Sequence, residues 1–360
     1  MSAARRLPAE WEPQSGVLLG WPHAGSDWAP VLAQVEPVFT RIALEVSRRE
    51  TLLLVCNDAT LAARVRDILH RAGADGRRVL TAIAPCNDTW ARDYGPIGIL
   101  ANGRPCLLDF RFNGWGEKHP WQHDDAVTAA LAAGGCFGST PTQRLPLVLE
   151  GGSIDSDGQG TLLTTRRCLL HPRRNPALSP TRLEQRLREL LGCERVLWLQ
   201  HGGLVGDDTD GHVDMLARFA GPGTLLYQSC SERGYPLYNE LEAMKGELQR
   251  LRDAGGRTYE TVPLPWPGPV QDEKGRRLPA SYANFLVIDG AVLVPAYGDA
   301  ADDEAARRIQ ACFPQRELVQ VPCRPLLQQG GSLHCLTMQL PRGIPLTECA
   351  ATTTHPQDRP

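Results

Sequence analysis

The sequence predicts a mixed α/β fold in a single domain, and three observations support that prediction. Strand–turn–strand patterns recur five times along the 360-residue chain, at residues 95–110, 152–164, 212–227, 282–295 and, with a weaker second strand, 331–340. Asn-Gly, Asp-Gly and Pro-Gly pairs stand between the apolar runs, and they favour hairpins because these turns need residues that tolerate positive φ. Segments typical of helices lie between the hairpins, and further strands follow several of them.

The elements follow one another in a regular order. Helices are predicted at residues 28–49, 61–72, 179–191, 237–254 and 300–313, and strands at 51–56 and 195–199. The repeating unit is therefore a hairpin, a helix and a strand, present about five times in one domain over residues 1–345. Residues 262–277 are rich in Pro and Gly and are predicted to form an irregular loop near a functional site. The polar, aperiodic residues 346–360 are expected to form a loose, flexible tail.

Composition and charge exclude several classes of partner. The chain has 38 Lys and Arg against 41 Asp and Glu, a formal net charge of −3, so no excess of positive charge favours nucleic acid or an anionic membrane. No apolar run approaches the ~20 residues of a membrane-spanning helix. The two arginines near the N-terminus are not followed by the apolar segment of a signal peptide, and a cytoplasmic location is expected.

Neither the cysteines nor the acidic residues form a pattern that predicts a metal or cofactor site. The eleven cysteines are scattered and none forms a Cys-x-x-Cys pair, so most are expected to be small buried hydrophobic residues. Asp207, Asp208 and Asp210 precede His212, but this segment lacks the register of a calcium loop, and no second histidine has ligand spacing. We therefore expect neither a metal nor a cofactor.

A polar residue stands at the start of each predicted hairpin, about 60 residues from the next. These residues are Asp93, Glu150, His212 with Asp214, Asn284, and Cys335. Five similar units packed around one axis would bring these positions together at one end of the domain. A thiol, an imidazole, an amide and three carboxylates would then share one cavity.

The chemistry of Cys335 and His212 suggests a catalytic pair. A free thiol has a pKa near 8.5, so Cys335 needs nearby positive charge to act as a nucleophile. His334 is expected to be structural, since neighbours on a strand point to opposite faces. His212 and Asp214 are two residues apart, which would place them on one face of a strand.

The acidic and aromatic residues favour a planar cation as substrate. Trp90 and Asp93 would offer an aromatic wall and an anion at a strand entrance. Glu150 follows the apolar residues 147–149 and is expected to be buried beside a partner. A guanidinium group fits such a site because it pairs bidentately with carboxylates, and agmatine, free arginine and arginine peptides all carry it.

Six motifs in order give the chain a family resemblance. They lie at residues 7–13, 89–96, 149–153, 208–214, 280–285 and 330–336, and read LPAEWEP, TWARDYGP, LEGGS, DTDGHVD, ASYANF and GGSLHCL. The chain resembles the agmatine deiminase family, which is related to bacterial-type peptidyl-arginine deiminases within the guanidino-modifying pentein superfamily. The resemblance implies a five-bladed, pseudo-symmetric α/β propeller, the pentein fold.

The same resemblance implies a role for each polar residue. Cys335 would be the nucleophile, His212 the general acid and base, Asp93 and Asp214 the clamp for the guanidinium nitrogens, and Glu150 the residue that orients His212. Attack by the thiolate on the guanidinium carbon would give a covalent thiouronium, and water would then release a ureido product. The reaction so implied is the hydrolysis of agmatine to N-carbamoylputrescine and ammonia.

Three further residues are expected to bind the substrate, and other activities stay open. Asp208 is expected to meet the distal ammonium, with Trp90 and Asn284 also in contact with the substrate. Asp210 and Met215 stand where agmatine deiminases commonly have Asn, so peptidyl-arginine or another guanidine is an alternative substrate, with Arg111 available to a carboxylate. An amidinotransferase and a non-catalytic guanidine-binding module are the alternatives of other classes. The family association suggests a homodimer.

Overall fold

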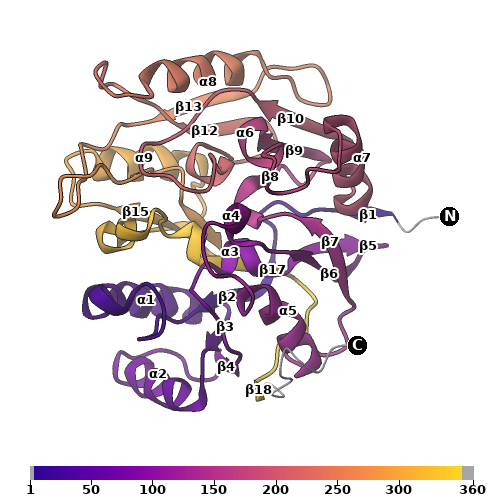
Figure 1. Cartoon of the computed structure of the whole chain (residues 1–360), viewed down its shortest axis with the longest axis vertical. Helices are drawn as coiled ribbons and strands as arrows, with labels where there is room; N and C mark the ends of the chain where they lie inside the picture. The colour runs from indigo at the N-terminus through magenta and orange to yellow at the C-terminus, as the bar shows by residue number, and fades with distance from the viewer. Residues whose placement is uncertain (1–3, 351–360) are drawn as a thin grey trace.

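Four consecutive blades of the same design form most of the molecule. The computed structural model describes residues 4–350. Figure 1 shows its helices at the periphery, with the short helices α3 (Ala91–Tyr94) and α4 (Gly114–Glu117) near the middle. In each blade the first strand pairs antiparallel with the second, and a helix then leads to a third strand parallel to the second. The blades are β5 (Ile97–Ala101), β6 (Arg104–Arg111), α5 (Asp124–Ala133) and β7 (Thr142–Val148); β8 (Ile154–Ser156), β9 (Thr161–Thr165), α7 (Pro180–Leu191) and β10 (Arg195–Leu199); β11 (Ala217–Phe219), β12 (Thr224–Gln228), α8 (Tyr238–Arg250) and β13 (Glu260–Leu264); and β14 (Leu286–Ile288), β15 (Ala291–Ala296), α9 (Asp302–Cys312) and β16 (Glu317–Pro322).

The fifth blade joins the two ends of the chain. Its strands are β17 (Thr337–Pro341), β2 (Gln14–Gly20), β3 (Thr51–Cys56), β4 (Val79–Ile83) and β18 (Cys349–Ala350), with α1 (Leu32–Ser47) and α2 (Ala59–Arg71) as connections. The expected hairpin at 331–340 is therefore wrong: β17 pairs antiparallel with β2, far away in sequence, and not with a returning strand of its own. This pairing covers a strand edge that would otherwise be exposed.

Local sequence explains where the helices begin and end. In α7, the Ser179 side chain accepts a bond from the backbone N–H of Arg182, Pro180 occupies the first turn, and Gly192 ends the helix at φ +68°. These are the residue types that cap a helix and allow a left-handed turn after it. Its leucines face the core, as do the apolar faces of the other long helices.

Short helical turns lead into the strands at the centre of the molecule, and three of the four overlap segments that were predicted as strands. They are α3 (Ala91–Tyr94), η2 (Gly151–Ser153), η3 (Val213–Met215) and η5 (His334–Leu336). The prediction that His212 and Asp214 share a strand face is therefore wrong, because His212 directly precedes η3 and the strand begins at Ala217. A compact turn at this point directs both side chains toward the central site.

Two irregular segments differ in part from expectation. The Pro-rich segment at 262–277 begins inside β13, and the remainder is irregular apart from an isolated bridge between Gln271 and Arg277. Of the segment expected as a tail, Cys349–Ala350 form β18 beside β4, and residues 351–360 lie outside the described residues.

Cys136 and Cys349 form a disulfide, while seven of the other nine cysteines are buried free thiols, as expected for most of them. Within residues 4–350, no helix is long and apolar enough to cross a bilayer.

Candidate active site

A cavity of about 700 Å³ opens at the centre of the blades. Among the residues that the sequence singles out, Trp90, Asp93, Asp208 and Cys335 line it. His212, Asp214, Glu150 and Asn284 are buried behind this lining. The pseudo-repeat therefore brings its polar positions to one region, with some at the cavity surface and others supporting them.

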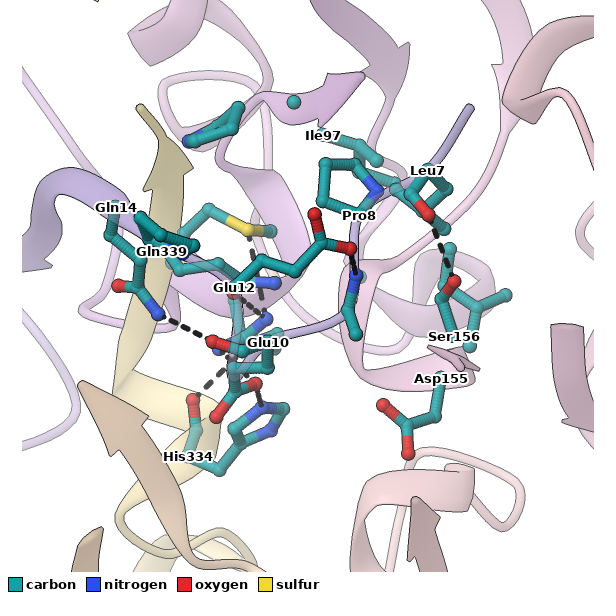
Figure 2. A pocket seen from close by; sticks show the side chains of 18 residues that line it. Leu7, Pro8, Glu10, Glu12, Gln14, Ile97, Asp155, Ser156, His334 and Gln339 are labelled. Atoms are coloured by element: carbon teal, nitrogen blue, oxygen red, sulfur yellow. Dashed lines mark hydrogen bonds and ion pairs between the residues drawn. The ribbon is translucent and has the colours of Figure 1, made fainter. Parts of the chain in front are cut away.

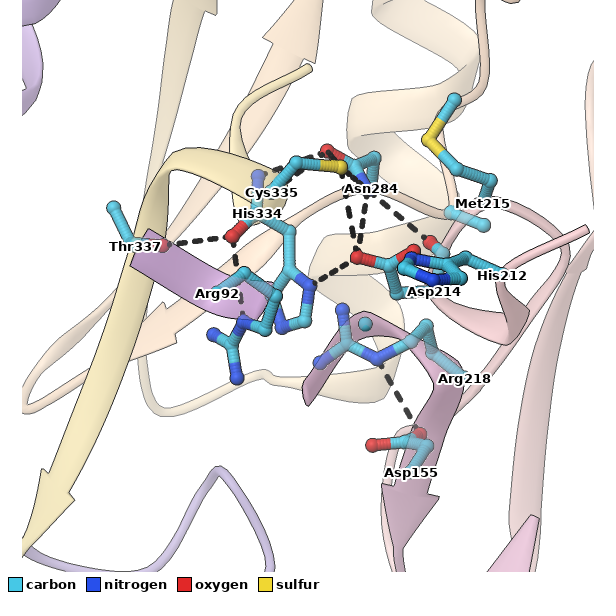
Figure 3. Close-up of polar contacts among 12 residues, drawn as sticks. Arg92, Asp155, His212, Asp214, Met215, Arg218, Asn284, His334, Cys335 and Thr337 are labelled. Carbon is cyan, nitrogen blue, oxygen red and sulfur yellow. Dashed lines mark hydrogen bonds and ion pairs between the residues drawn. The ribbon is translucent and has the colours of Figure 1, made fainter. Parts of the chain in front are cut away.

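The thiol of Cys335 lies in η5 at the cavity wall, with polar neighbours on its inner side (Figure 3). Asn284 Nδ2 donates to Cys335 Sγ at 3.2 Å, and Asp214 Oδ2 is 3.6 Å from the same sulfur. Burial raises the pKa of Cys335 well above its ordinary value, and the charges of Asp214 and Asp93 add to the effect. The protonated thiol is therefore the favoured form in this environment.

Asp214 is bound by a chain of buried polar and charged side chains. His334 faces Asp214 Oδ2 with Nδ1 at 2.8 Å and Glu10 Oε2 with Nε2 at 2.7 Å, so both ring nitrogens have structural partners. Burial opposes ionisation of Asp214, but the bond from His334 and nearby positive charge lower its pKa below the ordinary value. Asp214 thus stays ionised beside the thiol.

Glu10 anchors the other end of this chain beside a small enclosed space of about 40 Å³ (Figure 2). Arg218 Nη2 lies 2.8 Å from Glu10 Oε2, and Arg92 Nη2 lies 3.5 Å from the same oxygen. Burial opposes ionisation of Glu10, yet Arg218, His334 and Arg92 together hold its pKa well below the ordinary value. The motif at 7–13 thus contributes a buried counterion beneath the site.

His212, Asp93 and Asp214 converge on Gly152. A Cβ placed on Gly152 would lie 2.7 Å from His212 Nδ1, 2.8 Å from Asp93 Oδ1 and 3.1 Å from Asp214 Oδ2. His212 Nδ1 is itself 3.6 Å from Asp93 Oδ1. Although burial opposes the charged form, Asp93, Cys168 and Glu150 raise the pKa of His212 well above its ordinary value. The imidazole is therefore protonated and suited to donate a proton.

Asp93 lies in α3 and is fixed by two donors. Trp115 Nε1 donates to Asp93 Oδ2 at 2.9 Å, and the Gly152 backbone N–H donates to Oδ1 at 2.9 Å. Burial raises the pKa of Asp93 to about 6, with His212 and Trp115 opposing the shift and Asp214 adding to it. This carboxyl group lines the cavity and is mostly ionised above that pH and mostly protonated below it.

Glu150 is fully buried and paired with Arg174. Arg174 Nε lies 2.9 and 3.0 Å from the two carboxylate oxygens, and Arg174 Nη1 reaches Asp210 Oδ2 at 2.7 Å. Polar atoms of Glu150, Cys168 and His212 lie within 4.8 Å of one another, a spacing that would suit a metal ion. Both oxygens of Glu150 accept from Arg174 Nε, so an ion pair fixes this carboxylate close to His212.

The outer end of the cavity carries a second set of charges. His119 Nε2 lies 2.8 Å from Asp208 Oδ2, and Lys118 Nζ contacts the Asp208 carbonyl oxygen and, at 2.9 Å, Asp210 Oδ1. The Trp90 ring lies against Gly331, where any Cβ would clash with it. Trp90 thus forms a flat wall between the thiol and the outer end.

Sequence reasoning missed several residues that support this site. Trp115, His119, Cys168 and Arg174 lie within two blades, on the connections from the second strand to the helix and outside the repeated positions. The run Gly114-Trp-Gly116 carried one usable signal, because glycines beside an aromatic residue mark unusual backbone, and all three have positive φ.

A five-bladed α/β ring with a thiol, an imidazole and carboxylates at its centre is the arrangement of a pentein enzyme that acts on guanidinium groups. The chain belongs to the Porphyromonas-type peptidyl-arginine deiminase family, whose sequence pattern it matches over residues 6–341. The expected fold class and family resemblance are thereby confirmed.

Three relatives illustrate the similarity. The agmatine deiminase of Stutzerimonas stutzeri is 36% identical over 358 residues, covering 93% of this chain and 95% of the relative. A Porphyromonas gingivalis structure provisionally assigned as an arginine deiminase is 47% identical with a TM-score of 0.88, covering 94% of this chain and 99% of that one. A cysteine-to-serine variant of the Campylobacter jejuni agmatine deiminase with substrate bound is 35% identical with a TM-score of 0.87, covering 94% and 97%.

Proposed function

We propose that this protein is an agmatine deiminase, which hydrolyses agmatine to N-carbamoylputrescine and ammonia. The observation that carries the proposal is the convergence of His212, Asp93 and Asp214 on Gly152, beside a thiol that lines the cavity. Relatives named agmatine deiminase match this chain over 93% of its length, which supports the same conclusion.

The first half of the reaction forms a covalent intermediate. The guanidinium enters between Asp93 and Asp214, and its positive charge stabilises the thiolate of Cys335, whose proton is released to solvent. The sulfur attacks the guanidinium carbon, so a C–S bond forms. His212 gives its proton to a terminal nitrogen, the C–N bond breaks, and ammonia leaves.

Water completes the reaction. His212, now neutral, takes a proton from a water molecule that attacks the amidino carbon. The C–S bond then breaks and Cys335 leaves with its electron pair. The hydroxyl proton of the product passes to the sulfur, which regenerates the thiol and leaves a ureido group on the product. Glu150, fixed by Arg174, is the carboxylate placed to orient His212 in both steps.

Three residues would bind the parts of agmatine that do not react. Asp208, at the outer end of the cavity, would pair with the distal ammonium, and Trp90 would form the wall along the chain. Asn284 is buried, but its amide is 3.2 Å from the sulfur, so it would contact an amidino group bound to Cys335.

The charges around the cavity favour agmatine over a substrate with a carboxylate. The two arginines that line the cavity are already paired, Arg276 with Asp272 and Arg277 with Glu232. Arg111 stacks on Trp121 with its guanidinium carbon 5.5 Å from the ring centroid. Peptidyl-arginine would therefore have to break an existing pair or a cation–π contact.

A substrate panel tests the proposal. Agmatine, arginine and a peptidyl-arginine are each assayed for ammonia and for ureido product, with Cys335→Ala as the inactive control. We expect turnover with agmatine above the other two. Ammonia-free transfer of the amidino group to an added amine would instead identify an amidinotransferase. The homodimer and the cytoplasmic location stay predictions.

A further inference from the structure

The outer wall of the cavity already holds an imidazole at the position proposed for the substrate ammonium. His119 Nε2 is 2.8 Å from Asp208 Oδ2, and both side chains line the cavity. They are 36% and 44% exposed, so both are within reach of a ligand. A substrate ammonium that binds Asp208 must therefore share this carboxylate with an imidazole.

The segment that carries His119 is fixed against the rest of the site. Asn113 Oδ1 accepts from the Gly116 N–H at 3.0 Å, and Asn113 Nδ2 donates to the Arg173 carbonyl at 2.8 Å. The rings of Trp115 and His119 meet edge to face with centroids 5.4 Å apart. Because Trp115 also donates to Asp93, one rigid segment contacts the carboxylates proposed for both ends of the substrate.

The charges that face His119 come from three other loops. Asp208 and Asp27 favour the imidazolium, and the bond to Asp208 makes the largest contribution. Asp88 adds to them once it is ionised, since burial raises the pKa of its carboxyl to about 7. Together they raise the pKa of His119 above its ordinary value, although partial burial opposes the shift. Lys118 is adjacent and carries a fixed charge, whereas Arg276 and Arg277 on the cavity wall are neutralised by their own partners.

We infer that His119 sets the affinity for the distal ammonium by competing with it for Asp208, strongly when the imidazole is protonated and weakly when it is neutral. This inference rests on the proposed agmatine deiminase activity. The imidazolium and Asp208 together carry no net charge, so a dicationic substrate gains little from them. Once the imidazole loses its proton, the full negative charge of Asp208 is available to the substrate.

The test compares two substrates that differ only at the distal end. Butylguanidine carries the guanidinium on the same alkyl chain as agmatine but lacks the terminal amine. The KM for butylguanidine divided by the KM for agmatine measures the contribution of the ammonium, and the titration of groups that bind the guanidinium cancels in this ratio. In the unaltered protein the ratio should rise about fivefold to tenfold between about pH 6 and about pH 8.5.

Two substitutions at His119 separate charge from packing. His119→Phe keeps a ring against Trp115 and removes the titratable charge, so the ratio should be high and independent of pH. His119→Lys keeps a positive charge throughout, so the ratio should stay low. His123→Gln is the matched control, since His123 is exposed on the following turn and does not line the cavity, and it should keep the pH dependence.

Asp208→Asn distinguishes failure of this inference from failure of the proposed binding mode. The ratio should collapse and lose its pH dependence in Asp208→Asn if this carboxylate binds the ammonium. If Asp208→Asn collapses the ratio but His119→Phe keeps the original pH dependence, the role of His119 is refuted alone. If Asp208→Asn leaves the ratio as it was, the ammonium binds elsewhere and both assignments are refuted.

Discussion

Trp115→Phe is predicted to move the acid limb of the pH–rate profile toward higher pH. The indole N–H donates to Asp93 Oδ2 at 2.9 Å inside the protein and helps to hold down the pKa of this carboxyl, which burial raises to about 6. Phenylalanine keeps a ring beside Phe112, whose centroid lies 5.1 Å away, and keeps the same backbone conformation. The substitution therefore removes one donor and little else.

The size of the shift follows from the bond that is lost. A hydrogen bond to a charged group contributes about 1.5–3 kcal/mol, and one pKa unit corresponds to about 1.4 kcal/mol. Asp93 keeps the Gly152 N–H as a donor, so the lower end applies and its pKa should rise by roughly one unit. Because the proposed mechanism needs ionised Asp93, kcat/KM on the acid limb should fall about tenfold and recover above about pH 8.5.

The assay is kcat/KM for agmatine across the acid limb, with Trp121→Phe as the control. Trp121 belongs to the same loop region but stacks on Arg111 and does not contact Asp93. A Trp115→Phe profile that falls equally at every pH would show that the ring only packs. An unchanged profile would refute the role of Asp93 in substrate binding.

Three further substitutions test the supporting structure. Gly152→Ala places a methyl group 2.7 Å from His212 Nδ1 of the proposed general acid and should abolish turnover with the fold intact. Gly234→Ala is the control and should keep activity, because a Cβ at residue 234 would meet open space. Glu50→Gln should raise Tm at about pH 9 and not near pH 4. Burial and then Asp289 raise the pKa of the Glu50 carboxyl to about 8, so its ionisation has cost the folded state stability once the pH has risen through that value. An equal change in Tm at both pH values would contradict this explanation. Arg174→Met leaves Glu150 buried without its partner and should cost about 3–5 kcal/mol of stability, which Glu150→Gln in the same chain should restore if the loss is due to the unpaired charge.

The sequence predicts the local parts of the fold because the signals for them are local. The strand at residues 51–56 matches β3, and the Asp289-Gly290 turn lies between β14 and β15 as expected. The pairing of β17 with β2 has no such signal, since the two strands lie near opposite ends of the chain and either could be an edge strand. Only closure of the ring determines that they pair.

In the candidate site too, some residues could be predicted from the sequence and others could not. The repeat places Asp93, His212 and Cys335 in one region because equivalent positions meet at the centre of a ring. Trp115 and Arg174 lie on connections of differing length, so the repeat says nothing about where they come to lie. The turn η3 after His212 was not predicted, because its residues are also compatible with a strand.

Intact mass measurement of the enzyme quenched during turnover of agmatine tests the central claim most directly. The unaltered enzyme is quenched in acid, because His212 acts in both halves of the proposed reaction and a variant at this position would also slow the loss of ammonia. We predict an adduct with the mass of agmatine less ammonia, located on the peptide that contains Cys335 and missing from Cys335→Ser. Turnover by Cys335→Ser, or an adduct on another buried thiol such as Cys168, would contradict the assignment of this cysteine as the nucleophile.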